Sequence, residues 1–110
     1  MDSETALSLL AALSHPTRLE AFRQLVRHEP EGLATGALVE ASGLSQSTFS
    51  SQLAVMVKSE LVLSERRGRH QIQRANIDAL KGLMLFLAND CCQGRAELCG
   101  PLVAELAPCC

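Results

Sequence analysis

The chain has 110 residues, a net charge of −2 at neutral pH and a hydrophobic share of 47%, with only three aromatic residues. This length fits a single domain, and no apolar run reaches the roughly 18 residues that a membrane-spanning helix needs. The first residues are acidic, unlike those of a signal or transit peptide, so we expect a cytoplasmic protein. Leu and Ala must supply most of the core, which favours helices.

The charge is unevenly distributed. Residues 44–75 contain five basic and two acidic residues, whereas the remainder contains five basic and ten acidic ones. A basic middle segment on an acidic molecule is typical of a surface that faces a polyanion such as nucleic acid.

Residues 4–13 predict a short helix that is apolar on two faces. Its apolar side chains form one stripe of Leu7, Leu10 and Ala11 and a second of Leu9 and Leu13. Such a helix in so small a protein needs a second surface to bury against, and a partner subunit is the natural candidate.

Pro16 opens the next predicted helix, which Ser14 or His15 should cap, because proline is favoured in the first turn. The predicted core stripe of this helix is Leu19, Phe22, Leu25 and Val26. A short helix over residues 35–41 follows, capped by Thr35, with Leu38, Val39 and Leu44 directed inward.

The segment from Leu44 to Lys58 predicts a helix that Ser45 caps after a turn at Gly43. Its inward stripe is Phe49, Leu53 and Met56, and its opposite face carries Ser47, Ser51 and Lys58, flanked by Thr48, Ser50 and Ala54. A helix, a short turn and a second helix with a polar face free of acidic groups is typical of a helix-turn-helix, whose second helix enters the DNA major groove.

Residues 61–75 predict two short strands around the turn Arg66-Arg67-Gly68-Arg69, with Leu61 and Leu63 facing inward on the first strand. Three arginines around a glycine repel one another unless an anion offsets their charge. We therefore expect the turn to contact phosphate.

Asn76 or Asp78 caps the last predicted helix, which is again apolar on two faces. One stripe comprises Ile77, Leu80, Met84 and Leu87, and the other Leu83 and Phe86. The simplest arrangement pairs the first and last helices with their copies across a twofold axis, which predicts a homodimer.

Taken in this order, the elements resemble those of the ArsR/SmtB family of metalloregulatory repressors over roughly residues 4–92. The resemblance rests on Ala12-Leu13-Ser14-His15-Pro16-Thr17-Arg18-Leu19, on Gly43-Leu44-Ser45-Gln46-Ser47-Thr48-Phe49-Ser50-Ser51-Gln52-Leu53, and on Glu65-Arg66-Arg67-Gly68-Arg69. The family often has Arg and His where this chain has Ser51 and Gln52, so the operator sequence cannot be carried over.

The resemblance implies a mainly α-helical, homodimeric winged helix-turn-helix with a two-stranded β-wing. Such a protein is not an enzyme: it binds double-stranded operator DNA as apoprotein and releases it when a metal or metalloid binds. Residues 1–92 would form the DNA-binding and dimerisation domain, and residues 93–110 a cysteine-containing tail that completes the sensing site. The expected DNA contacts are Gln46, Ser47, Thr48, Ser50, Ser51, Gln52, Lys58, Arg66, Arg67, Arg69 and His70.

All five cysteines lie in the last twenty residues, and an odd number without a secretory signal argues against a disulfide framework. The cysteine pair that some family members carry in the first helix of the DNA-binding pair is missing, because residues 33–44 contain no Cys. The remaining Cys91, Cys92 and Cys99 look like the site of the arsenite-responsive branch.

Thiolates suit a soft ion, and trivalent arsenic or antimony takes three of them. A continuous helix would separate Cys92 from Cys99 by about 10.5 Å, so the helix should end near Cys92 for both to bind one ion. Cys109 and Cys110 are candidate accessory ligands or part of an unstructured tail. We therefore expect arsenite or antimonite as inducer.

Two alternatives remain. The same DNA-binding repressor could sense redox state, persulfide, an organoarsenical or another thiophilic ion through the vicinal pair. A protein-interaction module or metal carrier that never binds DNA is the other, and the arginine-rich turn argues against it.

Overall fold

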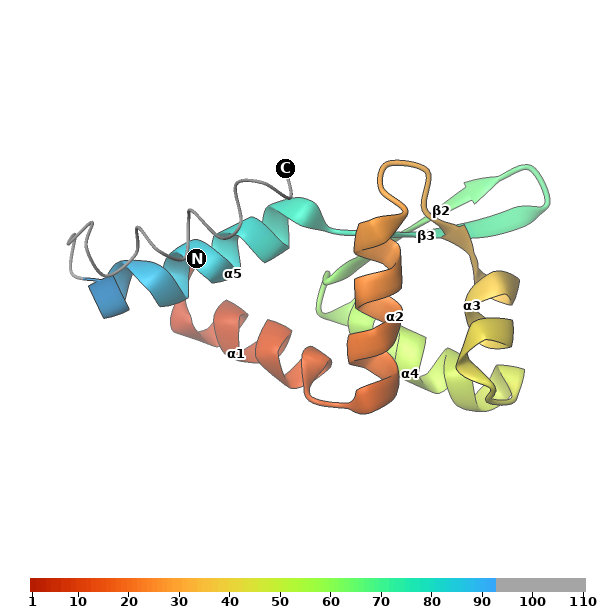
Figure 1. Cartoon of the computed structure of the whole chain (residues 1–110), viewed down its shortest axis with the longest axis horizontal. Helices are drawn as coiled ribbons and strands as arrows, with labels where there is room; N and C mark the ends of the chain where they lie inside the picture. Colours follow the sequence, from red (N-terminus) through yellow and green to blue (C-terminus); the bar gives the residue numbers. More distant parts are fainter. Residues whose placement is uncertain (93–110) are drawn as a thin grey trace.

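The computed structural model describes residues 1–92, with side chains through residue 88. Its elements are α1 (Ser3–Leu13), α2 (Pro16–Arg27), β1 (Leu33–Ala34), α3 (Thr35–Ser42), α4 (Gln46–Lys58), β2 (Val62–Arg67), β3 (His70–Ala75) and α5 (Ile77–Cys92). Figure 1 shows α2, α3 and α4 grouped beside the sheet, with the β2–β3 hairpin at one end of the molecule. This arrangement is the predicted winged helix-turn-helix.

Side chains cap most helices where the sequence predicted. His15 Nδ1 accepts from the Thr17 N–H at 3.1 Å, and Asn76 Oδ1 accepts from the Ala79 N–H at 3.2 Å, so these residues are the caps of α2 and α5. The predicted Thr35 cap is wrong, because Ala34 is the cap residue of α3 and makes no side-chain cap bond.

The core forms where α1, α2, α3, α4 and the base of the wing meet. The stripe of α4 is confirmed, since Phe49, Leu53 and Met56 are all buried. Three predicted core positions are exposed instead: Leu19, Val26 and Leu44. Leu19 and Val26 flank the true inward face of α2, which the buried Ala21, Phe22 and Leu25 define. Leu44 lies in the turn between α3 and α4, outside both helices.

The sheet has three antiparallel strands in the order β1-β3-β2, so the predicted two wing strands are confirmed and a third is added. In β1, Leu33 pairs with Gln73 and Ala34 with Ile72. The hairpin register runs from Val62 opposite Ala75 to the tip. The short β1 therefore fixes the base of the wing to the start of α3.

The prediction that Leu63 faces the core is wrong, because its side chain is 47% exposed. Leu61 is fully buried but precedes the strand, in the turn that leaves α4, where its N–H donates to the Met56 carbonyl at 3.0 Å. The strand begins at Val62, which takes the inward position. Because side chains alternate along a strand, Leu63 must point to the other face.

The helices α1 and α5 lie side by side at the end of the molecule opposite the wing tip (Figure 1). One side of α1 is buried through Ala6, Leu9 and Ala12, and Leu83 of α5 is buried with them in the core. Five large apolar side chains of these two helices are exposed on another face: Leu7, Leu10, Met84, Leu85 and Leu87. Both helices are therefore apolar on two faces, as predicted, and one face of each has no partner within residues 1–88.

Candidate nucleic-acid interface

The helix α4 turns its polar side outward. Gln46, Ser47, Thr48, Ser50 and Ser51 are all exposed, and so is Lys58 at the C-terminal end. The buried Phe49, Leu53 and Met56 hold the opposite side against the core. The exposed face carries no acidic residue. An exposed helix face of polar and basic side chains can enter the major groove without repelling phosphates.

The turn before α4 is fixed by local hydrogen bonds. Gly43 ends α3 in the left-handed conformation, with φ of 71°. The Ser42 hydroxyl accepts from the Leu44 N–H at 3.1 Å, and the Ser45 hydroxyl accepts from the Thr48 N–H at 3.2 Å. These bonds set the direction of α4 relative to α3, which is what a helix-turn-helix requires.

The hydroxyl groups of α4 differ in how far they are available. Ser51 donates to the Ser47 carbonyl at 3.2 Å, and the Thr48 hydroxyl accepts from that of Ser45 at 2.9 Å. The side chains of Gln46, Ser47, Ser50 and Lys58 have no hydrogen-bond or ion-pair partner within the described part of the chain. These four side chains can therefore bind DNA without first breaking a bond within the protein.

Gln52 is held differently from the other predicted contacts. It is half-buried at the edge of the exposed face, and its Oε1 accepts from Arg18 Nη1 at 2.6 Å. Arg18 also donates to the carbonyls at the C-terminal end of α1, to Ala12 at 2.7 Å and to Ala11 at 3.3 Å. Arg18 was not among the predicted site residues. No local pattern points to a contact between residues 34 positions apart.

The wing tip carries Arg66, Arg69 and His70, all exposed. The guanidinium of Arg66 reaches the Gly68 carbonyl at 3.4 Å. Arg69 has no side-chain partner among the described residues. Gly68, with φ of 61°, makes the turn that brings these charges together. The tip therefore holds two exposed arginines, Arg66 and Arg69, that no carboxylate in the described part of the chain neutralises.

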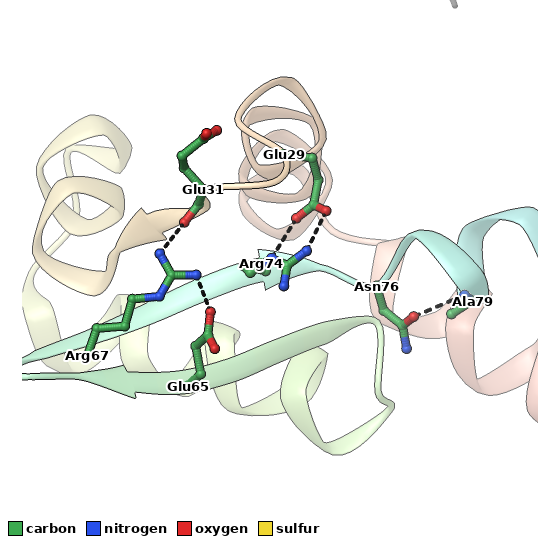
Figure 2. A network of polar contacts seen from close by, with 7 residues as sticks. All are labelled: Glu29, Glu31, Glu65, Arg67, Arg74, Asn76 and Ala79. Atoms are coloured by element: carbon green, nitrogen blue, oxygen red, sulfur yellow. Dashed lines mark hydrogen bonds and ion pairs between the residues drawn. The ribbon is translucent and has the colours of Figure 1, made fainter.

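Arg67 points back to the body of the protein rather than to the tip (Figure 2). Its Nη1 donates to the backbone carbonyl of Glu31 at 3.1 Å, and its Nη2 pairs with the Glu65 carboxylate. Phosphate would therefore compete with Glu65 for the Arg67 guanidinium. Because this pair is exposed, phosphate can still compete for the guanidinium.

Arg74, further along β3, forms a two-bonded pair with Glu29 (Figure 2). Its hydrogen bonds and the nearby charge of Glu29 raise the pKa of Arg74 above its ordinary value. Two of the five basic residues counted in the basic segment, Arg67 and Arg74, are thus neutralised by carboxylates. The free positive charge is concentrated on Lys58 and the wing tip.

The predicted thiol site lies outside the part of the chain whose side chains the structure describes. Cys91 and Cys92 lie on the last turn of α5, beyond the described side chains, and Cys99, Cys109 and Cys110 lie outside the described residues. Within the described part, no group of three or more His, Cys, Asp or Glu side chains could hold a metal ion. The described helices also include none that is long and apolar enough to cross a membrane.

Comparison with known proteins supports a regulatory role for this arrangement. A family model described as "Helix-turn-helix domain" matches residues 13–65. The chain is 34% identical to the nodulation protein NolR of Rhizobium meliloti over 88 residues, which cover 80% of this chain and 70% of that protein. It is 32% identical to the HTH-type transcriptional regulator YgaV of Escherichia coli K12 over 90 residues, covering 82% of this chain and 89% of that protein.

Solved structures of transcriptional regulators have the same fold as this chain. An ArsR-like transcriptional regulator from Rhodococcus sp. RHA1 superposes with a TM-score of 0.72 at 25% identity, covering 94% of this chain and 92% of that one. A homodimeric winged helix-turn-helix DNA-binding domain from Mycobacterium bovis superposes with a TM-score of 0.64 at 22% identity, covering 82% of each chain. The second likeness concerns the fold alone.

Proposed function

Because this chain belongs to the ArsR family of helix-turn-helix DNA-binding transcriptional regulators, we propose that it is a homodimeric repressor that trivalent arsenic or antimony releases from its operator. The fold and the relatives are those of regulators, not of enzymes. The observation that supports the proposal best is the exposed face of α4, which is polar, free of acidic residues and accompanied by the exposed Arg66 and Arg69 of the wing tip.

The proposed dimer uses α1 and α5. Their outward side chains include Leu7 and Leu85, which are 66% and 62% exposed, on two helices that lie side by side (Figure 1). Self-association across a twofold axis would bury this apolar surface in both copies. It would also present two α4 helices together, which suits half-sites about one helical turn (34–36 Å) apart on DNA.

The proposed sensing site is the thiol cluster of Cys91, Cys92 and Cys99, with Cys109 and Cys110 as accessory ligands. Support comes from the chemistry of the donor set, because thiolates are the preferred ligands of soft, thiophilic ions. A vicinal pair with a third cysteine seven residues later offers three such donors within one short segment.

The proposed coupling runs along α5. This helix starts at the base of the wing, at Ile77, and continues to Cys92, so one rigid element joins the wing strands to the first two thiols. Ordering of the thiol end would shift α5 against its copy and reorient the two α4 helices. A coupling free energy of about 2.7 kcal/mol is enough to lower operator affinity about 100-fold.

The second candidate function is a DNA-binding repressor that uses two cysteines to sense oxidation, persulfide or an organoarsenical. The adjacent Cys91 and Cys92 favour it, because two thiols suffice for these reactions. A protein-interaction module without DNA binding is disfavoured by the available wing cations and by the family.

The experiment is fluorescence anisotropy of the operator-bound protein, titrated separately with arsenite, antimonite, zinc, cadmium and peroxide. The wild type should be released by arsenite, and Cys99→Ser should not be. A variant with both Cys109→Ser and Cys110→Ser is the matched control, and it should still respond. A normal arsenite response of Cys99→Ser would disprove the three-thiolate site, and release by peroxide alone would favour the second candidate.

A further inference from the structure

Arg18 joins three helices through one side chain. It lies in the first turn of α2, and its Nε donates to the Ala12 carbonyl of α1 at 2.7 Å, while its Nη1 donates to Gln52 Oε1 of α4 at 2.6 Å. Nη2 adds a longer bond of 3.3 Å to the Ala11 carbonyl. The guanidinium is planar and its donors have fixed directions. It therefore cannot turn toward one of these helices without losing its bond to the other.

The bonds from Arg18 to α1 hold the end of that helix in place. The last four carbonyls of a helix lack partners within the helix, and α1 has no basic residue in its last turn. Arg18 supplies donors and the positive charge that a helix C-terminus favours. Its own helix is fixed, because His15 caps α2 while Phe22 and Leu25 are buried in the core. The end of α1 is thus bonded to a fixed point.

The bond from Arg18 to α4 restrains a motion that the core contacts of α4 leave open. Phe49, Leu53 and Met56 hold α4 against the core, and apolar contact has no preferred direction. A small rotation of α4 about its own axis therefore changes the buried area little. A hydrogen bond, in contrast, weakens steeply once its length and angle leave a narrow range. Because Gln52 lies at the edge of the exposed face, its bond to Arg18 restrains the direction of this face.

We propose that Arg18 is a positioning residue that fixes the DNA-facing side of α4 relative to α1, and thereby relative to the partner copy in the dimer. The inference rests on the proposed function, in which α1 forms part of the dimer interface and α4 enters the major groove. In a dimer, two such contacts fix the two α4 faces relative to one another. Arg18 therefore determines how strictly the protein requires one spacing between its half-sites.

The test measures how much affinity a wrong half-site spacing costs. An operator is first selected from randomised duplex DNA with the wild type, and a second duplex carries one extra base pair between the half-sites. This insertion moves one half-site by about 3.4 Å and turns it by about 35° around the DNA axis. The wild type should bind the second duplex about tenfold or more weakly, within the range that one mismatched base pair costs.

Arg18→Met and Gln52→Met each remove the bond between α2 and α4 while keeping an unbranched side chain. The bond can resist misalignment only up to its own free energy, so the spacing penalty should fall by about threefold or more in each variant, a factor that one net hydrogen bond can provide. The double variant should lose no more of the penalty than the single variants, because all three lack the same bond. Arg27→Met is the matched control, since it removes an exposed arginine of the same helix, and its penalty should equal that of the wild type.

The ratio of the two affinities separates positioning from other roles of these residues. A lost base contact of Gln52, or a loss of stability, lowers the affinity for both duplexes by the same factor and leaves the penalty unchanged. Gln52→Met retains the bonds between Arg18 and α1, so its result stands even when Arg18→Met does not fold. An unchanged penalty in Gln52→Met, or a wild type without a penalty, would overturn the positioning role while leaving the repressor intact. Failure of the wild type to select any sequence would overturn the proposed function and the inference together.

Discussion

Arg74 and Glu29 form a two-bonded ion pair, with Nε to Oε1 at 3.1 Å and Nη2 to Oε2 at 2.9 Å, which ties the middle strand of the sheet to the turn after α2. Arg67 makes a second tie to the same turn through the Glu31 carbonyl (Figure 2). The wing is thereby held in a fixed direction relative to α4. A wing and a recognition helix must keep that relation to contact the same stretch of DNA.

The arginines of the wing should therefore divide into two functional classes. Arg69→Gln should weaken binding equally on operator and unrelated DNA. It should also reduce the slope of log affinity against log salt by about two for a dimer, since each lost phosphate contact contributes about 0.9. Arg74→Gln should leave that slope unchanged, because Glu29 already neutralises this side chain. Titrating both variants between 50 and 200 mM salt, the range over which such contacts are conventionally compared, checks the difference. Equal slopes for the two variants would contradict this division.

The sequence predicted the helices and the inward face of α4 because these depend on spacing within one element. Phe49, Leu53 and Met56 recur at the helical period, and that period alone places them together. The side-chain alternation of β2 was assigned wrongly at Leu63. A short strand has too few residues for its sequence alone to determine which side chains face the core. In β2 this depends on the residue at which the turn after α4 ends.

Contacts between elements were not predictable in the same way. The bonds from Arg18 to Gln52 and from Arg74 to Glu29 join residues 34 and 45 positions apart. Each depends on how two elements pack, which local spacing does not encode. For the same reason, residues 44–75 carry less free positive charge than their composition indicates, because carboxylates pair with Arg67 and Arg74.

Two glycines with the same backbone conformation should respond very differently to substitution. Gly32 and Gly43 have φ of 75° and 71°. A Cβ at Gly43 meets nothing within 4 Å. Gly43→Ala should therefore lower the free energy of unfolding only by the strain of a left-handed alanine, about 1–2 kcal/mol. A Cβ at Gly32 would lie 2.4 Å from the Gln73 carbonyl oxygen, so Gly32→Ala should cost clearly more and displace β1 from β3. Urea unfolding of both variants measures the difference in the free energy of unfolding. Equal losses of stability would show that β3 moves to accommodate the added Cβ at Gly32.

The start of α1 should loosen in acid. The Thr5 side chain and backbone N–H both hydrogen-bond to the Asp2 carboxylate, which lowers the pKa of Asp2 below its ordinary 3.8. A carboxyl whose pKa is lower in the folded state adds stability above its unfolded pKa, and this stability is lost as the pH falls through the folded value. The Thr5 amide signal in NMR should therefore shift with a midpoint below 3.8. Asp2→Asn keeps a capping oxygen but does not titrate, so it should show no such transition. A midpoint at or above the ordinary value would contradict the capping bond.

The outward face of α1 and α5 should hold the dimer together. Fully burying one leucine contributes about 1.5–3 kcal/mol, and a twofold axis counts each change twice. Leu85→Glu, at a position that is 62% exposed in the single chain, should therefore raise the dimer dissociation constant by at least about 100-fold.

Leu63→Glu is the matched control, because Leu63 is also exposed but lies on the wing, and it should leave the dimer intact. Sedimentation equilibrium compares the two variants, with helical content measured by circular dichroism to confirm folding. A monomeric but folded Leu85→Glu should bind a single half-site weakly and lose the dependence on half-site spacing. Dissociation by Leu63→Glu rather than Leu85→Glu would place the interface on the wing instead.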